Sequence, residues 1–373
     1  MNPVLSNSDK GEGAGAHRPP AVFTCIYTGK MAYVQAHSHM KGLSPSFKLG
    51  QDTRLIHWLL EKNQPAVRYN ALVNLLDRKE DDPEVKEARS SIGRVGWAAD
   101  QLRLQGPRGF WEHHEPRNIP EWVDFLYSPP FVSTNWRALV LADLGLDSTD
   151  LRVRKIAELM FEYKLALSSP LNLFYEEVCR SANAARMMTR FGYGDDHRVR
   201  KLYDWLIEDQ REEGGWNCSQ GTPGTLDAWE ALAAFACVPK SKRSRKMTQA
   251  IEKGAEFYLE RKLIEEGEKY EPWFRFHYPN HYFYDILVGL DIITQLGFSD
   301  DRRLRPAVEI LRKKRQPDRT WILDRVHPDI GPGTKIHPDI VDIAPLVIEP
   351  AGKPSKWITL KALTVLKRTA EAQ

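Results

Sequence analysis

The sequence predicts an all-α protein that is built from repeated helical hairpins. Trp111, Trp216 and Trp321 lie at equal intervals of 105 residues, and each closes a version of one short loop. The first two loops begin at Gln105 and Gln210 and fit the pattern Q-x-x-x-G-x-W, whereas the third keeps only its tryptophan. A fixed period of this kind indicates a repeat architecture.

A second marker has the same interval and predicts where helices end and begin. The segments 191–198 and 296–303 share a glycine at their second position, two aspartates at the fifth and sixth, and an arginine at the eighth. Glycine readily ends a helix in the left-handed conformation, and an aspartate side chain accepts hydrogen bonds from the first N–H groups of the next helix. We therefore expect helix stops at Gly145, Gly192 and Gly297, and N-terminal caps at Asp150, Asp196 and Asp301.

The helices themselves are predicted from the spacing of apolar residues. Six apolar segments are expected to be helical, five of them marked by a small residue followed by leucine and the sixth by the run 183–188; the five pairs are Ala71-Leu72, Ala138-Leu139, Ala231-Leu232, Gly289-Leu290 and Ala362-Leu363. Six amphipathic stretches alternate with them, at about 53–62, 84–104, 151–166, 197–209, 245–262 and 302–315. This gives twelve helices in six hairpins, and no series of strands competes with them.

These loops and hairpins resemble a known family. The Q-x-x-x-G-x-W loops, the hairpins of roughly 50 residues and the segment from Gly352 to Leu360 resemble the α/α toroids of the squalene-cyclase and prenyltransferase type, in which such a loop is called a QW motif. The resemblance covers roughly residues 50 to 370 and is closest to small single-toroid members, whose activity is usually unassigned. It implies six inner helices around a central cavity and six outer helices around those.

Composition agrees with one large helical body. Of the 373 residues, 42% are hydrophobic and 28% are charged, which is enough to bury a sizeable core. The segment 2–20 is rich in Ser, Gly and Pro and has no periodicity. We therefore expect residues 1–45 to be a disordered tail and residues 46–373 to be a single toroid domain. The mildly apolar segment 21–34 is too short and too polar to span a membrane, and no secretory signal is evident.

Cysteine content and charge predict the setting of the protein. Four cysteines in a chain of this length do not make a disulfide framework, so a reducing, cytoplasmic location is expected. The net charge is only +3, and the basic run 240–246 is not interleaved with aromatic residues. A solvated loop is therefore favoured over nucleic-acid binding for this run, with peripheral contact to an anionic membrane as the alternative.

Carboxylates near the N-terminal ends of the inner helices are the candidate catalytic residues. When the inner helices are aligned on their small-Leu pairs, Asp227 and Asp285 fall at one level, four residues before the pair. Either could donate or accept a proton at the rim of a hydrophobic funnel. Glu176 precedes another inner helix, where it could act in the same way or only favour the helix dipole. We expect the substitution Asp285→Asn to abolish turnover and to leave the thermal midpoint within a few degrees.

Aromatic residues near these ends are the candidate substrate-binding residues. Their rings could stabilise a carbocation or bind an apolar chain, although aromatic residues at helical spacing also serve as core. The candidates are Trp136, Tyr175, Trp229, Tyr282, Tyr284 and Trp357.

The family resemblance also points to two kinds of chemistry that this chain matches only in part. Cyclases that protonate an alkene carry a D-x-D-D motif, and the nearest match here, Asp147-Ser-Thr-Asp150, is explained by capping. Protein prenyltransferases of this fold bind zinc through an aspartate, a cysteine two residues later and a histidine. Cys218, His277 and His281 could supply two of these ligand types, but Trp216 stands where the aspartate is required.

Three functions therefore stay open. The first is an enzyme, cyclase-like or prenyltransferase-like, that acts on an isoprenoid or another apolar chain in the central cavity. The second is a toroid that binds a lipid or a protein without catalysis, which the missing acid motif favours. The third is a carbohydrate-active α/α toroid, because glycosidases also pair carboxylates with aromatic platforms. The expected partner in the first case is an apolar small molecule.

Overall fold

The computed structural model describes residues 53–115, 117, 132–164, 177–219, 221–265, 267, 269–327 and 346–371. Within these ranges the chain is helical, and its only β-structure is three isolated bridges. None of its described helices is both long and apolar enough to cross a membrane. The tail predicted at 1–45 and the candidates Tyr175 and Glu176 lie outside the described residues.

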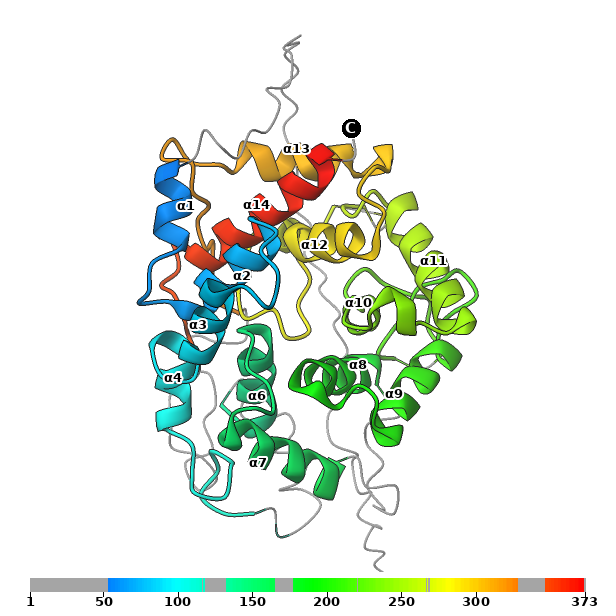
Figure 1. The fold of residues 1–373 in the computed structure, drawn as a ribbon. Helices are drawn as coiled ribbons and strands as arrows, with labels where there is room; N and C mark the ends of the chain where they lie inside the picture. The colour runs from blue at the N-terminus through cyan, green and yellow to red at the C-terminus, as the bar shows by residue number, and fades with distance from the viewer. Residues whose placement is uncertain are drawn as a thin grey trace, which may run out of the picture. The chain divides into compact units, whose positions relative to one another are not determined.

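Six helices form an inner series and carry the predicted apolar segments. Successive members of this series contact one another from α6 onward, and α14 contacts α2, the first of them. Figure 1 shows α14 beside both α12 and α2. The inner helices are α2 (Pro65–Asn74), α6 (Thr134–Asp143), α8 (Val178–Met188), α10 (Glu230–Ala236), α12 (Ile286–Leu296) and α14 (Lys356–Glu371).

The remaining α-helices lie against the inner ones as hairpin partners. Each predicted amphipathic stretch contains at least one helix, and the stretch 84–104 contains two, because the chain turns at Gly96 with a φ of +76°. Contacts join α3 to α2, α7 to α6, α9 to α8, α11 to α10 and α13 to α12. These outer helices are α1 (Thr53–Leu59), α3 (Pro83–Ser91), α4 (Gly96–Arg103), α7 (Leu151–Leu159), α9 (His197–Glu208), α11 (Arg245–Glu260) and α13 (Arg305–Lys313).

The three periodic tryptophans occupy equivalent places. Each indole N–H donates to the carbonyl oxygen ten residues earlier in the sequence, at the end of an outer helix. The N···O distance is 3.0 Å for Trp111, 2.8 Å for Trp216 and 2.8 Å for Trp321. All three side chains are buried, and two of them are fully buried. Each indole thus donates to a carbonyl in the last turn of a helix. For Trp216 and Trp321 this carbonyl has no other donor within the described residues, whereas the Gln101 carbonyl also accepts from the Leu104 N–H.

The glutamine and glycine of the first two loops have the same function in both. The Gln210 amide donates to the carbonyls of Gly214 and Ala250, at 2.8 and 2.9 Å, and so joins the loop to α11. The Gln105 amide makes the matching pair of bonds. Gly214 has a φ of +95°, and a Cβ there would lie 2.4 Å from the Lys253 carbonyl oxygen, so only glycine fits.

The third loop reaches the same shape with different residues. Arg315 stands at the glutamine position, and its Nε donates to the carbonyl of Arg319 at 3.3 Å. Arg319 stands at the glycine position and adopts a φ of +71°, which is strained for a residue with a side chain. The period is therefore kept in structure where the sequence pattern has decayed.

The predicted caps and stops are confirmed at each of the three equivalent corners. Asp150, Asp196 and Asp301 each accept from the backbone N–H two residues later, at 2.8 to 2.9 Å. An arginine at that later position also pairs through its side chain with the same carboxylate. The preceding glycines have φ values of +99°, +99° and +107°.

Candidate functional site

Residues of the inner helices and of their connections line two adjoining cavities. The first, here called the aromatic cavity, has a volume of about 60 Å³ and is lined in part by Arg186, Trp229, His277, Tyr278, Asp285 and Trp357. The second, here called the charged cavity, has a volume of about 220 Å³ and is lined in part by Asn70, Asn74, Arg89, Thr364 and Arg368. Five residues line both cavities: Asp143, Arg190, Asp291, Gln295 and Lys361. The residues that adjoin both cavities are therefore mostly charged.

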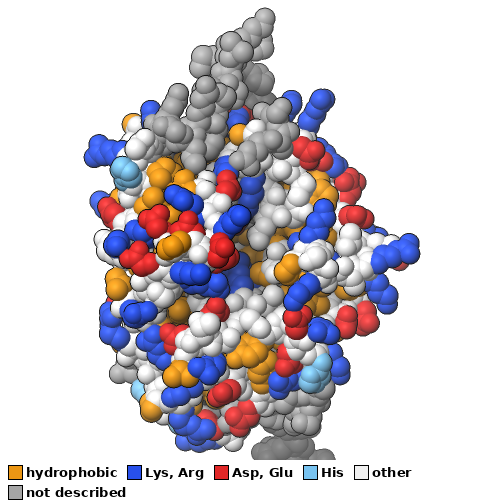
Figure 2. Space-filling view, in the orientation of Figure 1, with side chains coloured by type: hydrophobic (Ala, Val, Ile, Leu, Met, Phe, Trp, Pro, Cys, Tyr) orange, Lys and Arg blue, Asp and Glu red, His pale blue; other side chains and the backbone are white. Residues whose placement is uncertain are grey.

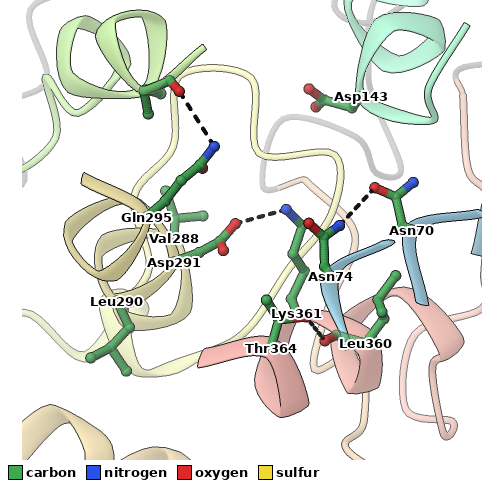
Figure 3. Close-up of polar contacts among 12 residues, drawn as sticks. Asn70, Asn74, Asp143, Val288, Leu290, Asp291, Gln295, Leu360, Lys361 and Thr364 are labelled. Carbon is green, nitrogen blue, oxygen red and sulfur yellow. Dashed lines mark hydrogen bonds and ion pairs between the residues drawn. The ribbon is translucent and has the colours of Figure 1, made fainter. Parts of the chain in front are cut away.

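Asp291 of α12 anchors one side of the charged cavity. Its carboxylate pairs with Lys361 at 2.7 Å and with Arg368 at 2.8 Å, both from α14. Burial raises the pKa of Asp291, but Lys361 and Arg368 outweigh burial and lower that pKa to about 2. Figure 3 shows the ion pair between Asp291 of α12 and Lys361 of α14. It also shows Asn74 of α2, which lines the same cavity. Asp291 is therefore anionic at any physiological pH.

Asp143 of α6 anchors the other side. It pairs with Arg190, which follows α8, and Arg186 of α8 lies 3.8 Å away. The Tyr278 hydroxyl donates to its second oxygen at 3.5 Å. Burial, followed by the charge of Asp143, raises the pKa of Tyr278 well above its ordinary value, so this hydroxyl keeps its proton. Asp143 is thus shared among two guanidinium groups and one phenol.

The charges around the two cavities do not balance. Arg186, Arg190, Lys361 and Arg368 are cationic, and the carboxylates that pair with them are Asp143 and Asp291. Asp285 is a third carboxylate in the lining, but it pairs with His277, so the cations outnumber the carboxylates by one. Arg89 also lines the charged cavity, but it pairs with Asp147 at 2.7 Å. Figure 2 shows lysine and arginine side chains gathered at the hollowed middle of the face. An excess of positive charge in a recess attracts anions.

Asp285 lies in the wall of the aromatic cavity and is almost completely buried. It caps α12 by accepting from the Val288 N–H at 2.9 Å. Its other oxygen accepts from the His277 backbone N–H at 3.1 Å and from the His277 ring Nδ1 at 2.9 Å. The Nε2 atom of His277 has no partner among the described residues. In the neutral ring Nδ1 then carries the proton, and Nε2 is left as an acceptor.

Asp227, the second predicted carboxylate, has different surroundings. It is half-buried, and its Oδ1 accepts from the Trp273 indole N–H at 3.0 Å. It does not line either of the two cavities. The alignment that gave Asp227 and Asp285 one level therefore does not place them together around a common space.

Glu230 is a buried carboxylate that the sequence reasoning missed. It is the first residue of α10 and has no exposed surface, and neither of its oxygens has a hydrogen-bond partner in the described part of the chain. Burial, followed by the neighbouring Cys218, raises the pKa of Glu230 well above its ordinary value. In the sequence it was indistinguishable from the acidic residues that commonly start a helix.

The substitution Glu230→Gln is expected to flatten the dependence of stability on pH. A carboxyl whose pKa is higher in the fold than in the unfolded chain takes up a proton on folding, so its contribution is complete below the unfolded pKa and is lost as pH rises through the folded pKa. Arg186, Asp227 and Cys218 face this group and stay in place. As pH rises from 5 to 8, the thermal midpoint of the unsubstituted protein should fall more steeply than that of Glu230→Gln. The difference in slope should correspond to the uptake of about one proton on folding. Glu158→Gln, at an exposed site on α7, serves as the control. Parallel curves for Glu230→Gln and the unsubstituted protein would show that Glu230 is ionised in the fold.

The predicted metal ligands do not converge. Among the described residues, no three His, Cys, Asp or Glu side chains are placed to hold a metal ion. The neighbouring Cys179 thiol is the largest cause that lowers the pKa of the Cys218 thiol. The ring of His281 packs against Trp136, with centroids 4.7 Å apart, and lies 5.8 Å from the ring of His327.

Burial also decides the protonation state of His281 and His327, whose rings pack together. It lowers the pKa of His281 well below the usual range, and the positive charge of Arg186 adds to the effect. Burial lowers the pKa of His327 in the same way, with His281 next in effect. Both rings are therefore neutral at physiological pH. His327 lies far along the sequence from the other histidines, so no spacing pattern announced this cluster.

Two of the predicted aromatic residues, Trp229 and Trp357, line the aromatic cavity. Tyr284 is fully buried in the core, and its hydroxyl donates to the Leu263 carbonyl at 2.8 Å. Trp136 and Tyr282 pack on each other, with ring centroids 5.7 Å apart. Tyr278 also lines the cavity, although it was not among the six candidates.

Comparisons with known proteins identify no family. No protein-family model matches the sequence, and no curated protein is similar to it. Among solved structures, the fold is similar to a type II terpene cyclase from Scytonema in complex with its product, merosterolic acid A. The TM-score is 0.41 with 13% sequence identity, and the match covers 87% of this chain and 100% of the other. A likeness at that level carries no conclusion about the activity of this protein.

Proposed function

We propose that residues 46–373 form an α/α toroid of the terpenoid-cyclase and prenyltransferase type. The order of contacts supports this: α6, α8, α10, α12 and α14 follow one another, and α14 returns to α2. The outer helices pack on the inner helices of their own hairpins. A series of parallel hairpins that returns to its start has a centre lined by inner helices, and the two cavities are lined by residues of these helices and their connections.

The ligand that we propose for this centre carries an isoprenoid or another apolar chain. The aromatic cavity carries this part of the proposal: Trp229, Tyr278 and Trp357 supply ring faces, and Ile292 and Ile358 supply aliphatic surface. Ring faces bind apolar and unsaturated groups and stabilise positive charge next to them. Cavities of 60 and 220 Å³ lie below the 300 to 1,000 Å³ that is typical of ligand pockets, which favours a short chain.

Within this proposal, His277 is the candidate proton acceptor and Asp285 positions it. The carboxylate of Asp285 fixes the ring through Nδ1, and His277 is itself part of the cavity wall. A histidine held by a buried carboxylate is the arrangement in which one ring nitrogen is kept available as a base. The alternative is a toroid that binds the same ligand without changing it.

Binding of geraniol, a short isoprenoid alcohol, tests the proposed function. Isothermal titration should show saturable binding, and Trp357→Leu should weaken it about tenfold, because a ring face is worth about 1 kcal/mol or more in a desolvated site. Trp97→Leu is the control, since Trp97 is half-buried on α4 and lines neither cavity. Absence of saturable binding, or equal weakening by both substitutions, would contradict the proposal. Recovery of unchanged geraniol after long incubation would favour the non-catalytic alternative.

A further inference from the structure

Arg186 is a buried arginine whose donors are largely unused. Its side chain is only 7% exposed, and its Nη2 donates to the Asn183 side chain at 3.1 Å. Its Nη1 lies 3.8 Å from Asp143, beyond hydrogen-bond distance, and its Nε has no partner within the described residues. A guanidinium group carries five N–H donors, and buried polar groups are nearly always satisfied in native proteins.

Among the described residues, no carboxylate lies within hydrogen-bond distance of this group. Asp143 already pairs with Arg190, and it also accepts from the Tyr278 hydroxyl. Glu230 is the other acidic neighbour; neither of its oxygens has a hydrogen-bond partner among the described residues, and burial raises its pKa well above the ordinary value, which favours its neutral form. Two guanidinium groups therefore share a single carboxylate. A buried charge without a full partner is costly, and an anionic ligand at this place would supply the missing partner.

The surroundings of Arg186 show where that partner would lie. The guanidinium carbon is 5.2 Å from the centre of the Trp229 ring, so Arg186 is held against the aromatic wall. Arg190 and Lys361 line the aromatic cavity and also the charged cavity next to it. The charged cavity is the larger of the two, and its polar side chains include Asn70 and Asn74. The volume suits a hydrated polar group, and the aromatic cavity suits a chain attached to it.

We propose that Arg186 binds an anionic oxygen group of the ligand, a carboxylate or a phosphoryl group, where the two cavities adjoin. This inference rests on the proposed function and adds the class of head group to it. The planar fork of arginine matches two oxygens of one such group, which makes recognition specific as well as favourable. Arg190 and Lys361 add positive charge from the shared wall. The apolar chain of the ligand then lies along Trp229 and Trp357.

Four probes separate this inference from the proposed function. Geraniol carries the chain alone, geranic acid adds a carboxylate, geranyl phosphate adds a phosphoryl group, and inorganic phosphate is a head group alone. Titrations are made at pH 7 and at one ionic strength. At least one of the two charged ligands should bind about tenfold or more tightly than geraniol, and its affinity should fall with added salt while that of geraniol does not. The tighter of the two identifies the head group.

Substitutions at Arg186 complete the test. Arg186→Gln should bring the charged ligand to the affinity of geraniol and leave geraniol within about twofold. Arg186→Lys keeps the charge without the fork and should retain part of the preference, which gives a second variant if the first does not fold. Arg200→Gln is the control, because Arg200 is exposed on the outer helix α9.

Equal binding of all three geranyl ligands, or a preference that survives Arg186→Gln, would overturn the inference and leave the proposed function standing. Binding of none of them would overturn the proposed function itself. Binding of inorganic phosphate as tightly as geranyl phosphate would show an ion site unrelated to the chain and would also overturn the inference.

Discussion

Replacing Trp216 by alanine is expected to lower the free energy of unfolding by about 3–5 kcal/mol, the range for removing a large aromatic side chain from a packed core. The indole is fully buried and packs on the Phe235 ring, with centroids 6.0 Å apart. It also lies so close to Gly254 that a Cβ there would be 2.8 Å from an indole carbon. The protein therefore loses packing that the surrounding helices cannot easily restore.

The substitution also removes a hydrogen bond that ends an outer helix. Without the indole N–H, the Leu206 carbonyl at the end of α9 has lost its 2.8 Å donor in a buried place. Denaturant unfolding measures the effect. Trp321→Ala should cost a similar amount, because its environment is equivalent, and Trp97→Ala should cost clearly less, because Trp97 is only half-buried. Equal midpoints for Trp216→Ala and the unsubstituted protein would show that this loop does not stabilise the fold.

The substitution Asp285→Asn is expected to lower the free energy of unfolding by about 2–4 kcal/mol, since it leaves buried donors without an acceptor. The amide oxygen can still cap α12 at Val288, as asparagine caps helices well. Its NH₂ group, however, faces the two N–H donors of His277. The expectation from the sequence, that this exchange spares stability, is therefore revised by the contacts.

A matched substitution separates this effect from a general loss of charge. Asp227→Asn keeps an oxygen for the Trp273 indole at a half-buried site and should change stability by less than about 1 kcal/mol. Thermal and denaturant unfolding of both variants make the comparison. A stable Asp285→Asn protein would mean that His277 can turn its donors elsewhere. Loss of activity in that variant cannot be assigned to proton transfer unless its fold is first shown to be intact.

The helices were predictable because the information that sets them is local. Glycine stops, aspartate caps and apolar spacing each act within a few residues, and the period of 105 residues repeats them. The split of 84–104 into two helices was missed, because Gly96 lies inside a pattern that reads as continuous. The decayed third loop shows the limit of the pattern, since Arg315 keeps a bond that a search for glutamine does not find.

The candidate site was predictable where a residue lies at the N-terminal end of an inner helix: Trp229 and Asp285 immediately precede α10 and α12, and Trp357 lies in the first turn of α14. Trp229, Trp357 and Asp285 were found in this way. Glu230 was missed because its burial depends on how α10 is rotated between Arg186 and Cys218, which no spacing in α10 records. His277 and Tyr278 come from irregular chain before α12, and His327 comes from a different connection. Tertiary packing alone brings His277 and Tyr278 to the wall of the aromatic cavity, and His327 against the ring of His277.

The contact of α14 with the first hairpin has a consequence for how the chain folds. Lys356 pairs with Glu61 at 2.6 Å, and Lys367 pairs with Asp77, so two ion pairs join residues almost 300 positions apart. The hairpins between them can form early, because their contacts are local and their loops are short. Joining the two ends of the series must wait until α14 has been synthesised and the intervening hairpins have brought it near α2, since closing so long a loop in a disordered chain is costly in entropy. During translation the inner faces of α2 and α12 consequently remain open to water, and a chaperone that shields apolar helix faces has the most to protect in that interval.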